Sequence, residues 1–253
     1  MKHKPNRGLT LLELVVVLAI MVALAGLIVP HIADLPDKSS SVTNATIVAD
    51  TDRAVQLFDS RYGRQPSAWD SLLNNSGILY SRLNPSLTSS SPALIQASTL
   101  DAGQVQSLLK AGITGVHDAD ESLSGAPSNN STHWRAIAND GKVVTLVKNP
   151  ITTTHGDTVI DSAFGINQHS PMWANEFVVF GLGGAAEVKG TTMTEVPLAL
   201  SANPLTYYAR ALCVYMIPAT GANSIFPAQF VGTFLPDGST LRHNVDKYHV
   251  TSN

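Results

Sequence analysis

The segment from residue 8 to residue 30, GLTLLELVVVLAIMVALAGLIVP, constrains this chain more than any other feature. It is apolar throughout except for Thr10 and Glu13. From Leu9 to Ile32 it covers 24 residues, whereas about 20 are enough for a helix to span a bilayer. No polar face interrupts residues 14–29, which argues against a core helix of a soluble protein. The segment therefore predicts a transmembrane helix over residues 9–32.

The charges around this segment predict its orientation. Residues 1–8, MKHKPNRG, carry three cations and no acid, and Asp34 and Asp37 follow the segment. By the positive-inside rule the N-terminus is cytoplasmic and the rest of the chain lies outside. A cleaved secretory signal would need a small-x-small site, where Pro30 and His31 stand instead. A plain signal anchor would leave the intramembrane acid unexplained.

The basic leader, Gly8, the stretch Leu9 to Glu13 and the apolar run together resemble the class III signal of type IV pilins and type II secretion pseudopilins. The resemblance implies that a prepilin peptidase cuts between Gly8 and Leu9 and methylates the new N-terminus at Leu9. Leu9 departs from the phenylalanine that is usual in the family. The resemblance also implies a single-pass protein of the bacterial inner membrane with a periplasmic C-terminal domain. Its expected partners are identical or related subunits in a filament, an assembly platform protein and a cytoplasmic ATPase.

Glu13 has a physical explanation within this resemblance. After cleavage, Leu9 carries a free amine, and Glu13 lies four residues further along the same helix near its positive end. The amine that compensates the acid could belong to the neighbouring subunit of a filament. A buried pair of this kind adds specificity more reliably than stability. We therefore expect Glu13 to act in assembly by setting the axial stagger between subunits.

A hinge is predicted after the apolar segment. Pro30 removes a backbone donor and can kink a helix, and the polar run 34–41 is expected to loosen the chain further. Helical periodicity resumes at Val42 and continues to Tyr62, where Gly63 is placed to end the helix. The expected organisation is a leader at 1–8, an assembly helix at 9–32, a hinge at 33–41 and a globular domain at 42–253.

A second resemblance covers residues 54–73, AVQLFDSRYGRQPSAWDSLL. Major pseudopilins of type II secretion follow their long helix with a Tyr, a Gly-Arg-x-Pro turn and a short helix that ends in leucines. The residues of this chain that carry the resemblance are Tyr62, Gly63, Arg64, Pro66, Trp69, Leu72 and Leu73.

The remaining sequence predicts an α+β fold, in which the outer half of the long helix packs on a mainly antiparallel sheet. Residues 86–98 are expected to form a loop, and residues 100–111 a helix closed by Gly112. Asn139, Asp140 and Gly141 are typical of a hairpin turn between two strands. The predicted strands are residues 134–138, 142–147, 159–164, 176–180, 207–217 and 229–234.

The sequence offers little sign of catalysis, and we do not expect an enzyme. Residues 181–186 fit G-x-G-x-x-A, but no acid for a ribose follows at the required distance, so a turn is favoured. The histidines are scattered without H-E-x-x-H, and His243 with His249 is a weak metal candidate on a strand or loop. Cys213 stands alone in an apolar stretch, where a small buried residue is expected.

Charge and composition bound the possible partners further. Without Lys2, Lys4 and Arg7, 13 basic residues remain against 19 acidic ones, a formal charge of −6. Nucleic acid is therefore not an expected partner. No cofactor is expected, although calcium is kept open. Asp118, Asp120 and Glu121 cluster in a predicted loop, and carboxylate oxygens are the ligands that calcium prefers.

The expected function is that of a structural subunit of a type IV pilus-like filament or of a type II secretion pseudopilus. The alternative is a minor tip subunit whose domain binds a surface, a secreted substrate or DNA. A membrane-anchored enzyme is a distant third hypothesis, because the sequence shows no clustered acid, base and nucleophile.

Overall fold

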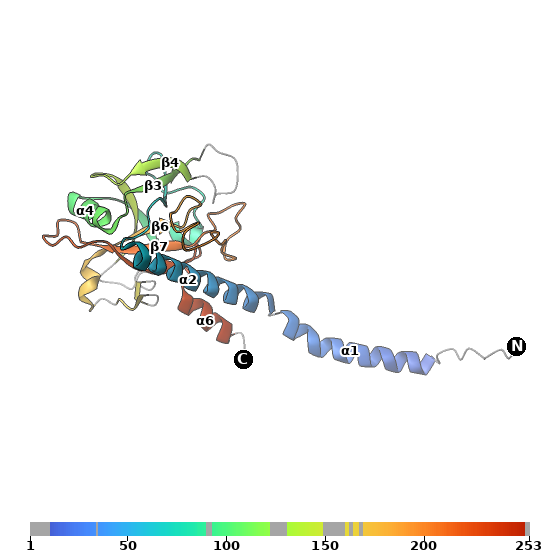
Figure 1. Cartoon of the computed structure of the whole chain (residues 1–253). Helices are drawn as coiled ribbons and strands as arrows, with labels where there is room; N and C mark the ends of the chain where they lie inside the picture. The colour runs from blue at the N-terminus through green and yellow to red at the C-terminus, as the bar shows by residue number, and fades with distance from the viewer. Residues whose placement is uncertain are drawn as a thin grey trace.

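The chain forms a helical rod with an α+β domain packed along its second half (Figure 1). The computed structural model describes residues 11–33, 35–89, 93–121, 131–148, 160–161, 164–166 and 169–250, without the side chains of residues 25–33, 131, 132 and 250. The rod consists of α1 (Leu11–Ala33) and α2 (Leu35–Tyr62). α1 projects away from the domain, whereas α2 lies along it (Figure 1).

α2 confirms the predicted outer helix. Ile47, Val48, Ala54, Val55 and Phe58 are buried at helical spacing on the face that packs against the domain. The helix ends where the sequence predicted, because a glycine at residue 63 adopts a positive φ of 65°. Its beginning differs from the expectation: residues 35–41 are helical, so most of the predicted hinge segment 33–41 is not a loop. Motion at this point stays a prediction.

The domain is built on one sheet of eight strands. Six follow in the order β2-β5-β6-β1-β3-β4, and β7 pairs with β6 and with β8. Of the described strand pairs only β1 with β3 is parallel, which confirms a mainly antiparallel sheet. The strands are β1 (Trp69–Asn74), β2 (Ile95–Thr99), β3 (Gly115–Ala119), β4 (Ser131–Ala136), β5 (Lys142–Leu146), β6 (Glu176–Gly181), β7 (Leu212–Ile217) and β8 (Gln229–Phe234).

The central strands are covered on both faces. Alternate residues of β6 and β7, such as Phe180 and Tyr215, pack with α2 and with α4 (Ala102–Ala111). The intervening residues, such as Phe177 and Val214, pack on the other face with Leu87 of α3 (Pro85–Thr88). All six residues of β7 are consequently buried, as is usual for a strand between two layers.

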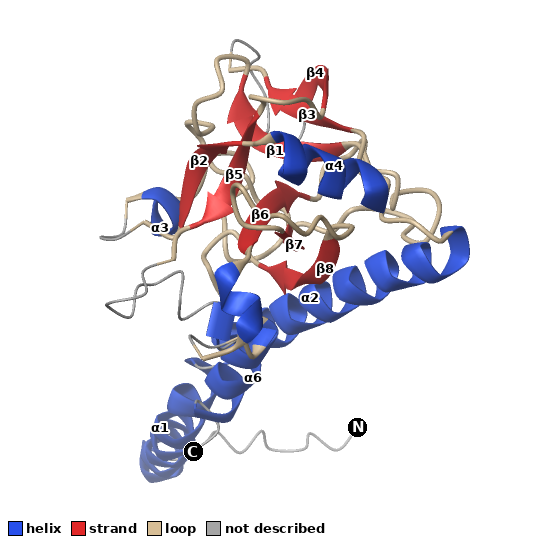
Figure 2. Cartoon of the chain, turned by 90° about the vertical axis from the view of Figure 1, so that its left-hand side faces the viewer, coloured by secondary structure: helices blue, strands red, loops and turns tan. Residues whose placement is uncertain are grey.

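The smaller helices frame this sheet. α4 confirms the helix predicted at 100–111: Asp101 and Gln104 form a capping box, and Gly112 ends the helix at a φ of 96°. A 3-10 helix, η2, occupies Pro171–Ala174. The C-terminal helix α6 (Leu241–Val250) lies beside α2 on the side of the domain that faces α1 (Figure 2).

Several local predictions were wrong. Residues 69–74 form β1 instead of a short helix, because Trp69 to Leu73 are all buried between two layers. The expected loop at 86–98 contains most of α3 and the start of β2. The expected strand at 159–164 is helical at its described residues 160, 161 and 164. His243 and His249 lie on α6, not on a strand or loop.

The predicted hairpin around Asn139 and Gly141 was also wrong. Its turn exists, since the Gly141 amide donates to the carbonyl of Ala138 and Asp140 has a φ of 60°. The flanking strands nevertheless do not pair with each other: β4 pairs with β3, and β5 pairs with β2 and β6. The turn forms, but pairing with strands that are distant in the sequence takes precedence over pairing across the turn.

Candidate functional site

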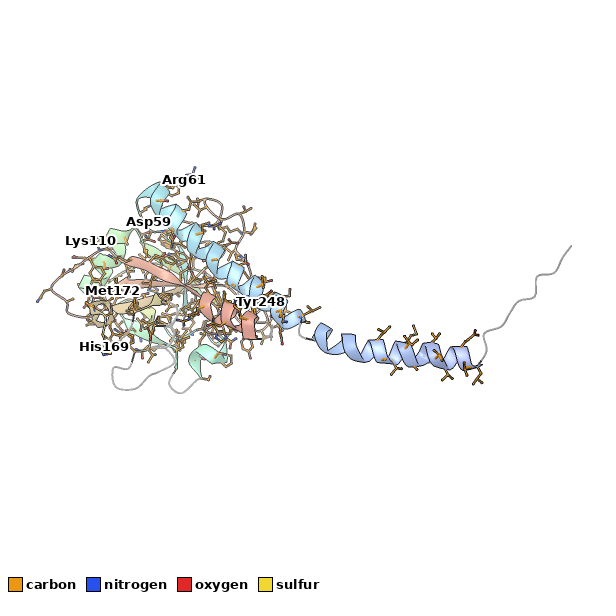
Figure 3. The ribbon with its side chains drawn as sticks, turned by 90° about the horizontal axis from the view of Figure 1, so that it is seen from below. Asp59, Arg61, Lys110, His169, Met172 and Tyr248 are labelled. Carbon is orange, nitrogen blue, oxygen red and sulfur yellow. The ribbon has the colours of Figure 1, made fainter. Side chains whose placement is uncertain are left out.

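The most unusual surface of the described chain is the apolar side of α1. Every described side chain of this helix, residues 11–24, is exposed. Leu11 is 81% and Leu12 73% exposed, and the large apolar side chains that follow, from Leu14 to Leu24, are about half exposed or more. The helix stands clear of the domain (Figure 3). A contiguous apolar surface of this size requires lipid or another protein to cover it.

Among the predicted processing and assembly residues, Glu13 lies within the described part of the chain. Glu13 is in the first turn of α1 and its side chain is exposed. Gly8 and Leu9 lie outside the described residues, and residue 30 is inside α1, although the Pro30 side chain is not described. Within the part of the chain that the structure describes, none of the helices combines the length and apolar character needed to cross a bilayer.

A compact polar junction joins the rod to the sheet just after α2. Arg64 forms a two-pronged ion pair with Glu187, at 2.6 Å from Nη1 to Oε2 and 3.1 Å from Nη2 to Oε1. The guanidinium also lies 5.2 Å from the ring centre of Phe58 on α2. Hydrogen bonds from Arg64 hold the pKa of Glu187 below its ordinary value. Arg64 thus connects the helix end to a turn 123 residues away.

Ser67 completes this junction. Its backbone N–H donates to Glu187 Oε2 at 2.8 Å, and its carbonyl accepts from the Glu187 amide at 3.1 Å. Its hydroxyl accepts from the backbone N–H groups of Thr114 and Gly115. The junction therefore ties the end of α2 to the start of β3 and to the turn after β6. Sequence reasoning identified Arg64 but missed Glu187 and Ser67, because no local pattern reports a contact across the domain.

Trp69 and the leucines after it place the first strand in the core. The Trp69 side chain is fully buried, and its Nε1 donates to the carbonyl of Pro66 at 2.7 Å. Leu72 and Leu73 are buried on the other face of the sheet. Of the residues singled out by the second resemblance, Arg64 and Trp69 contact the rod side of the domain, Leu72 and Leu73 belong to the opposite layer, and Tyr62 remains 47% exposed at the helix end.

The three predicted calcium candidates are separately engaged. Asp118 accepts from Arg135 Nε at 2.7 Å and Nη2 at 3.0 Å, and from the Ser71 hydroxyl. Asp120 lies 3.9 Å from His133, and Glu121 accepts from the backbone N–H of Ser81. The described residues contain no group of three or more His, Cys, Asp or Glu side chains that could hold a metal ion. Calcium at this position stays a prediction.

The glycine-rich segment 181–186 is a turn, as predicted. A Cβ added at Gly183 would lie 2.0 Å from Asp70 Oδ1, and one at Gly181 would lie 2.2 Å from the Tyr208 hydroxyl. Tyr208 donates to Asp70 Oδ2 at 2.8 Å in this buried cluster. The glycines are therefore explained by close packing against Asp70 and Tyr208, with no need for a phosphate ligand.

Another carboxyl with restricted access to water is that of Asp52, a half-buried residue of α2. Asp52 packs towards Thr233 of β8 and Cys213 of β7, and desolvation raises its pKa to about 6. Its Oδ1 has no hydrogen-bond partner. Cys213 is fully buried and unpaired, as predicted, and burial raises the pKa of its thiol.

Comparison with known proteins identifies the N-terminal segment. Residues 3–29 match the family model described as the prokaryotic N-terminal methylation motif. The chain therefore carries the signal of type IV pilins and pseudopilins, which confirms the resemblance of its N-terminal segment. The class of protein that this signal defines is pilin-like and processed by prepilin peptidase. No curated protein and no solved structure matches the chain.

Proposed function

We propose that this chain is a structural subunit of a type IV pilus-like filament or of a type II secretion pseudopilus. In this proposal prepilin peptidase cuts after Gly8 and methylates Leu9. The subunit then remains in the inner membrane until assembly, with its N-terminus in the cytoplasm and its domain in the periplasm. A platform protein and an ATPase move it into the filament. The single observation that carries the proposal is the methylation motif at residues 3–29.

The exposed surface of α1 supports an assembly role for this helix. Exposing apolar surface to water costs about 25 cal/mol per Å², so once α1 has left the bilayer it requires neighbouring apolar helices to cover it. In the membrane the same surface would contact lipid, and in the filament it would contact neighbouring copies of α1. Glu13 interrupts the otherwise apolar helix near its start. We propose that Glu13 pairs with the Leu9 amine of an adjacent subunit and thereby fixes their stagger.

Intact-mass and N-terminal peptide spectrometry test the processing step. The full chain is expressed in bacterial membranes with and without a prepilin peptidase, and the purified protein is measured. With the peptidase we expect a mature chain that begins at Leu9 and carries one methyl group. Gly8→Leu should block the cut, whereas Gly26→Ala, a glycine change within the same apolar segment, should leave it intact. A chain that still begins at Met1, or a cut beyond Ile32, would overturn the proposal.

Location along the filament separates a major from a minor subunit. A major subunit would be labelled along the whole filament by an antibody against the domain, whereas a minor subunit would be labelled at the tip alone. The large size of the domain, expected at residues 42–253, favours examining both positions. Binding of a secreted substrate or a surface belongs to the second alternative.

A further inference from the structure

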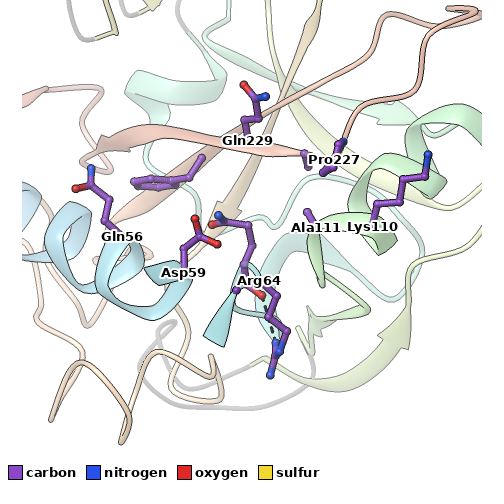
Figure 4. Close-up of a pocket in the computed structure, with 11 residues that line it drawn as sticks. Gln56, Asp59, Arg64, Lys110, Ala111, Pro227 and Gln229 are labelled. Carbon is purple, nitrogen blue, oxygen red and sulfur yellow. Dashed lines mark hydrogen bonds between the residues drawn. The ribbon is translucent and has the colours of Figure 1, made fainter. Parts of the chain in front are cut away.

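A hollow opens at the end of α2 that points away from α1. It has a volume of about 410 Å³ and lies between the end of α2, the end of α4 and the segment that leads into β8 (Figure 4). Asp59 and Lys110 line the hollow, and their labels in Figure 3 show that it lies at the end of the domain opposite α1. At 1.5 Å per residue, the 28 residues of α2 place it about 40 Å from the junction with α1. Its volume lies in the range of small-molecule sites, roughly 300–1,000 Å³.

Gln65 gives this hollow an unsatisfied polar group. The residue is 8% exposed and lines the hollow, and its side-chain Oε1 is buried without a hydrogen-bond partner. Its backbone is fixed, because its N–H donates to the Ala111 carbonyl and its own carbonyl accepts from Arg64. A buried acceptor without a donor lowers stability, because it has lost its hydrogen bonds to water without a replacement. The oxygen is covered by protein, so a ligand in the hollow reaches it only when the Gln65 side chain turns towards the hollow, and a hydrogen bond donated to it there would remove this penalty.

The charges around the hollow balance one another. Asp59 contributes a negative charge and Lys110 a positive one, and Arg64 is already paired with Glu187. The carbonyl ends of α2 and α4 also meet here, and helix C-termini disfavour anions. The positive charge of Lys110 in turn disfavours a cation. The hollow therefore suits a neutral ligand that both donates and accepts hydrogen bonds.

The remaining lining groups narrow the class of ligand. Gln56 and Gln229 each present an amide that can donate and accept, and both are exposed at the rim. Phe230 provides a half-buried aromatic ring, held by Tyr215 at a centroid distance of 5.5 Å. Amides and a carboxylate match vicinal hydroxyl groups, and an aromatic ring can cover the apolar face of a pyranose. We propose that this hollow binds a neutral carbohydrate residue. The inference goes beyond the filament role and does not rest on it.

Ligand-observed NMR tests this binding site. The full chain is purified in lauryldimethylamine oxide, since a sugar-headed detergent would compete. Saturation-transfer spectra are then recorded with glucose, galactose, mannose, N-acetylglucosamine and N-acetylgalactosamine. Glucosamine and glucuronate serve as charged comparators. We expect at least one neutral sugar to bind, and to bind more tightly than both charged comparators.

The matched variants are Gln65→Leu and Gln96→Leu. Gln96 is an exposed glutamine on β2, outside the hollow. Gln65→Leu should weaken sugar binding at least about tenfold and should not lower the melting temperature, because it removes a buried unpaired oxygen. Gln96→Leu should leave binding unchanged. Absence of binding by every neutral sugar, equal binding of the charged comparators, or unchanged binding by Gln65→Leu would each overturn the inference and leave the filament proposal intact.

Discussion

Arg64 and Glu187 are 123 residues apart in the sequence, yet their side chains meet in a parallel two-pronged ion pair just beyond the end of α2. Glu187 also holds the backbone of Ser67 through both its side chain and its amide. The pair therefore joins the helix end, the entry to β1 and the turn after β6. The rod and the sheet meet here through specific polar contacts as well as apolar packing.

Glu187→Ala is expected to destabilise the domain by about 1 to 2 kcal/mol. The change removes two charge-assisted hydrogen bonds from Arg64 and one from the Ser67 amide, while partial exposure limits the value of the ion pair. Urea unfolding of the wild type and the variant measures the difference. The loss should shrink in 1 M NaCl, where exposed charges are screened.

Glu195→Ala is the control for this prediction. Glu195 is 76% exposed and pairs with Lys189 at 3.1 Å, so its removal should change the free energy of unfolding by less than about 0.5 kcal/mol. Equal effects of the two substitutions would show that the Arg64 contact adds nothing beyond a surface ion pair.

Asp52 should make the stability of the domain depend on pH. Its pKa is about 6 in the folded chain against an ordinary value of 3.8, so between these values the folded state holds a proton that the unfolded state has lost. Stability should therefore fall as the pH rises from about 4 to 6, by about 2 to 3 kcal/mol in total. Urea unfolding at intervals across this range measures the slope.

Asp52→Asn should remove this part of the pH dependence and raise stability at pH 7 relative to the wild type. Asp50→Asn, an exposed change on the same helix, should leave the slope in place. If the wild type and Asp52→Asn lose stability in parallel from pH 4 to pH 6, the carboxyl is not titrating in the folded chain as expected.

Arg135→Ala should destabilise the domain by about 3 to 5 kcal/mol, because among the described residues it leaves the Ser71 hydroxyl as the one donor to the buried carboxylate of Asp118. The variant also tests the calcium prediction. If Asp118, Asp120 and Glu121 hold calcium, millimolar calcium should raise the melting temperature of Arg135→Ala more than that of the wild type. An equal response, or no response, would argue against an ion at these carboxylates. Arg242→Ala, at an exposed pair on α6, is the control.

Glu13→Leu should reduce filament yield at least tenfold without preventing membrane insertion, since the change removes the charge proposed to pair with the Leu9 amine while making α1 more apolar. Quantifying filaments in the sheared fraction, and subunits in the membrane fraction, measures the two effects. Leu14→Ile preserves the apolar character of the neighbouring position and should assemble normally. Normal yield and normal axial rise in Glu13→Leu would exclude a role for the acid in stagger.

The parts of the fold that could be predicted from sequence are those set by local chemistry. The closing Gly112 and the helix end at Gly63 each depend on residues close by in the sequence, and both predictions were confirmed. The strand at 69–74 was missed because its buried run shows no alternation, and such runs do not distinguish a strand from a buried helix. The failed hairpin around Gly141 has the same origin, since β4 and β5 found better partners elsewhere in the sheet.

The candidate sites also divide into those that a local sequence motif predicts and those that depend on contacts between distant residues. Gly8, Leu9 and Glu13 could be proposed from the sequence because a prepilin signal is a linear motif, and residues 3–29 match the model of that motif. Gln65 and Glu187 could not, because their roles depend on Ala111 and Arg64 being brought beside them by the fold. The spacing of residues in the sequence does not predict these two contacts.

The position of β1 determines how the domain would respond to mechanical load. This strand follows the rod directly and lies between β6 and β3 inside the sheet, not at an edge. A pull along α1 and α2 would therefore reach the middle of the sheet and strain the hydrogen bonds of two neighbouring strands together. An interior strand cannot be removed by breaking its hydrogen bonds to one neighbour alone. A subunit pulled through its N-terminal helix would therefore move as a folded unit before its domain unfolded.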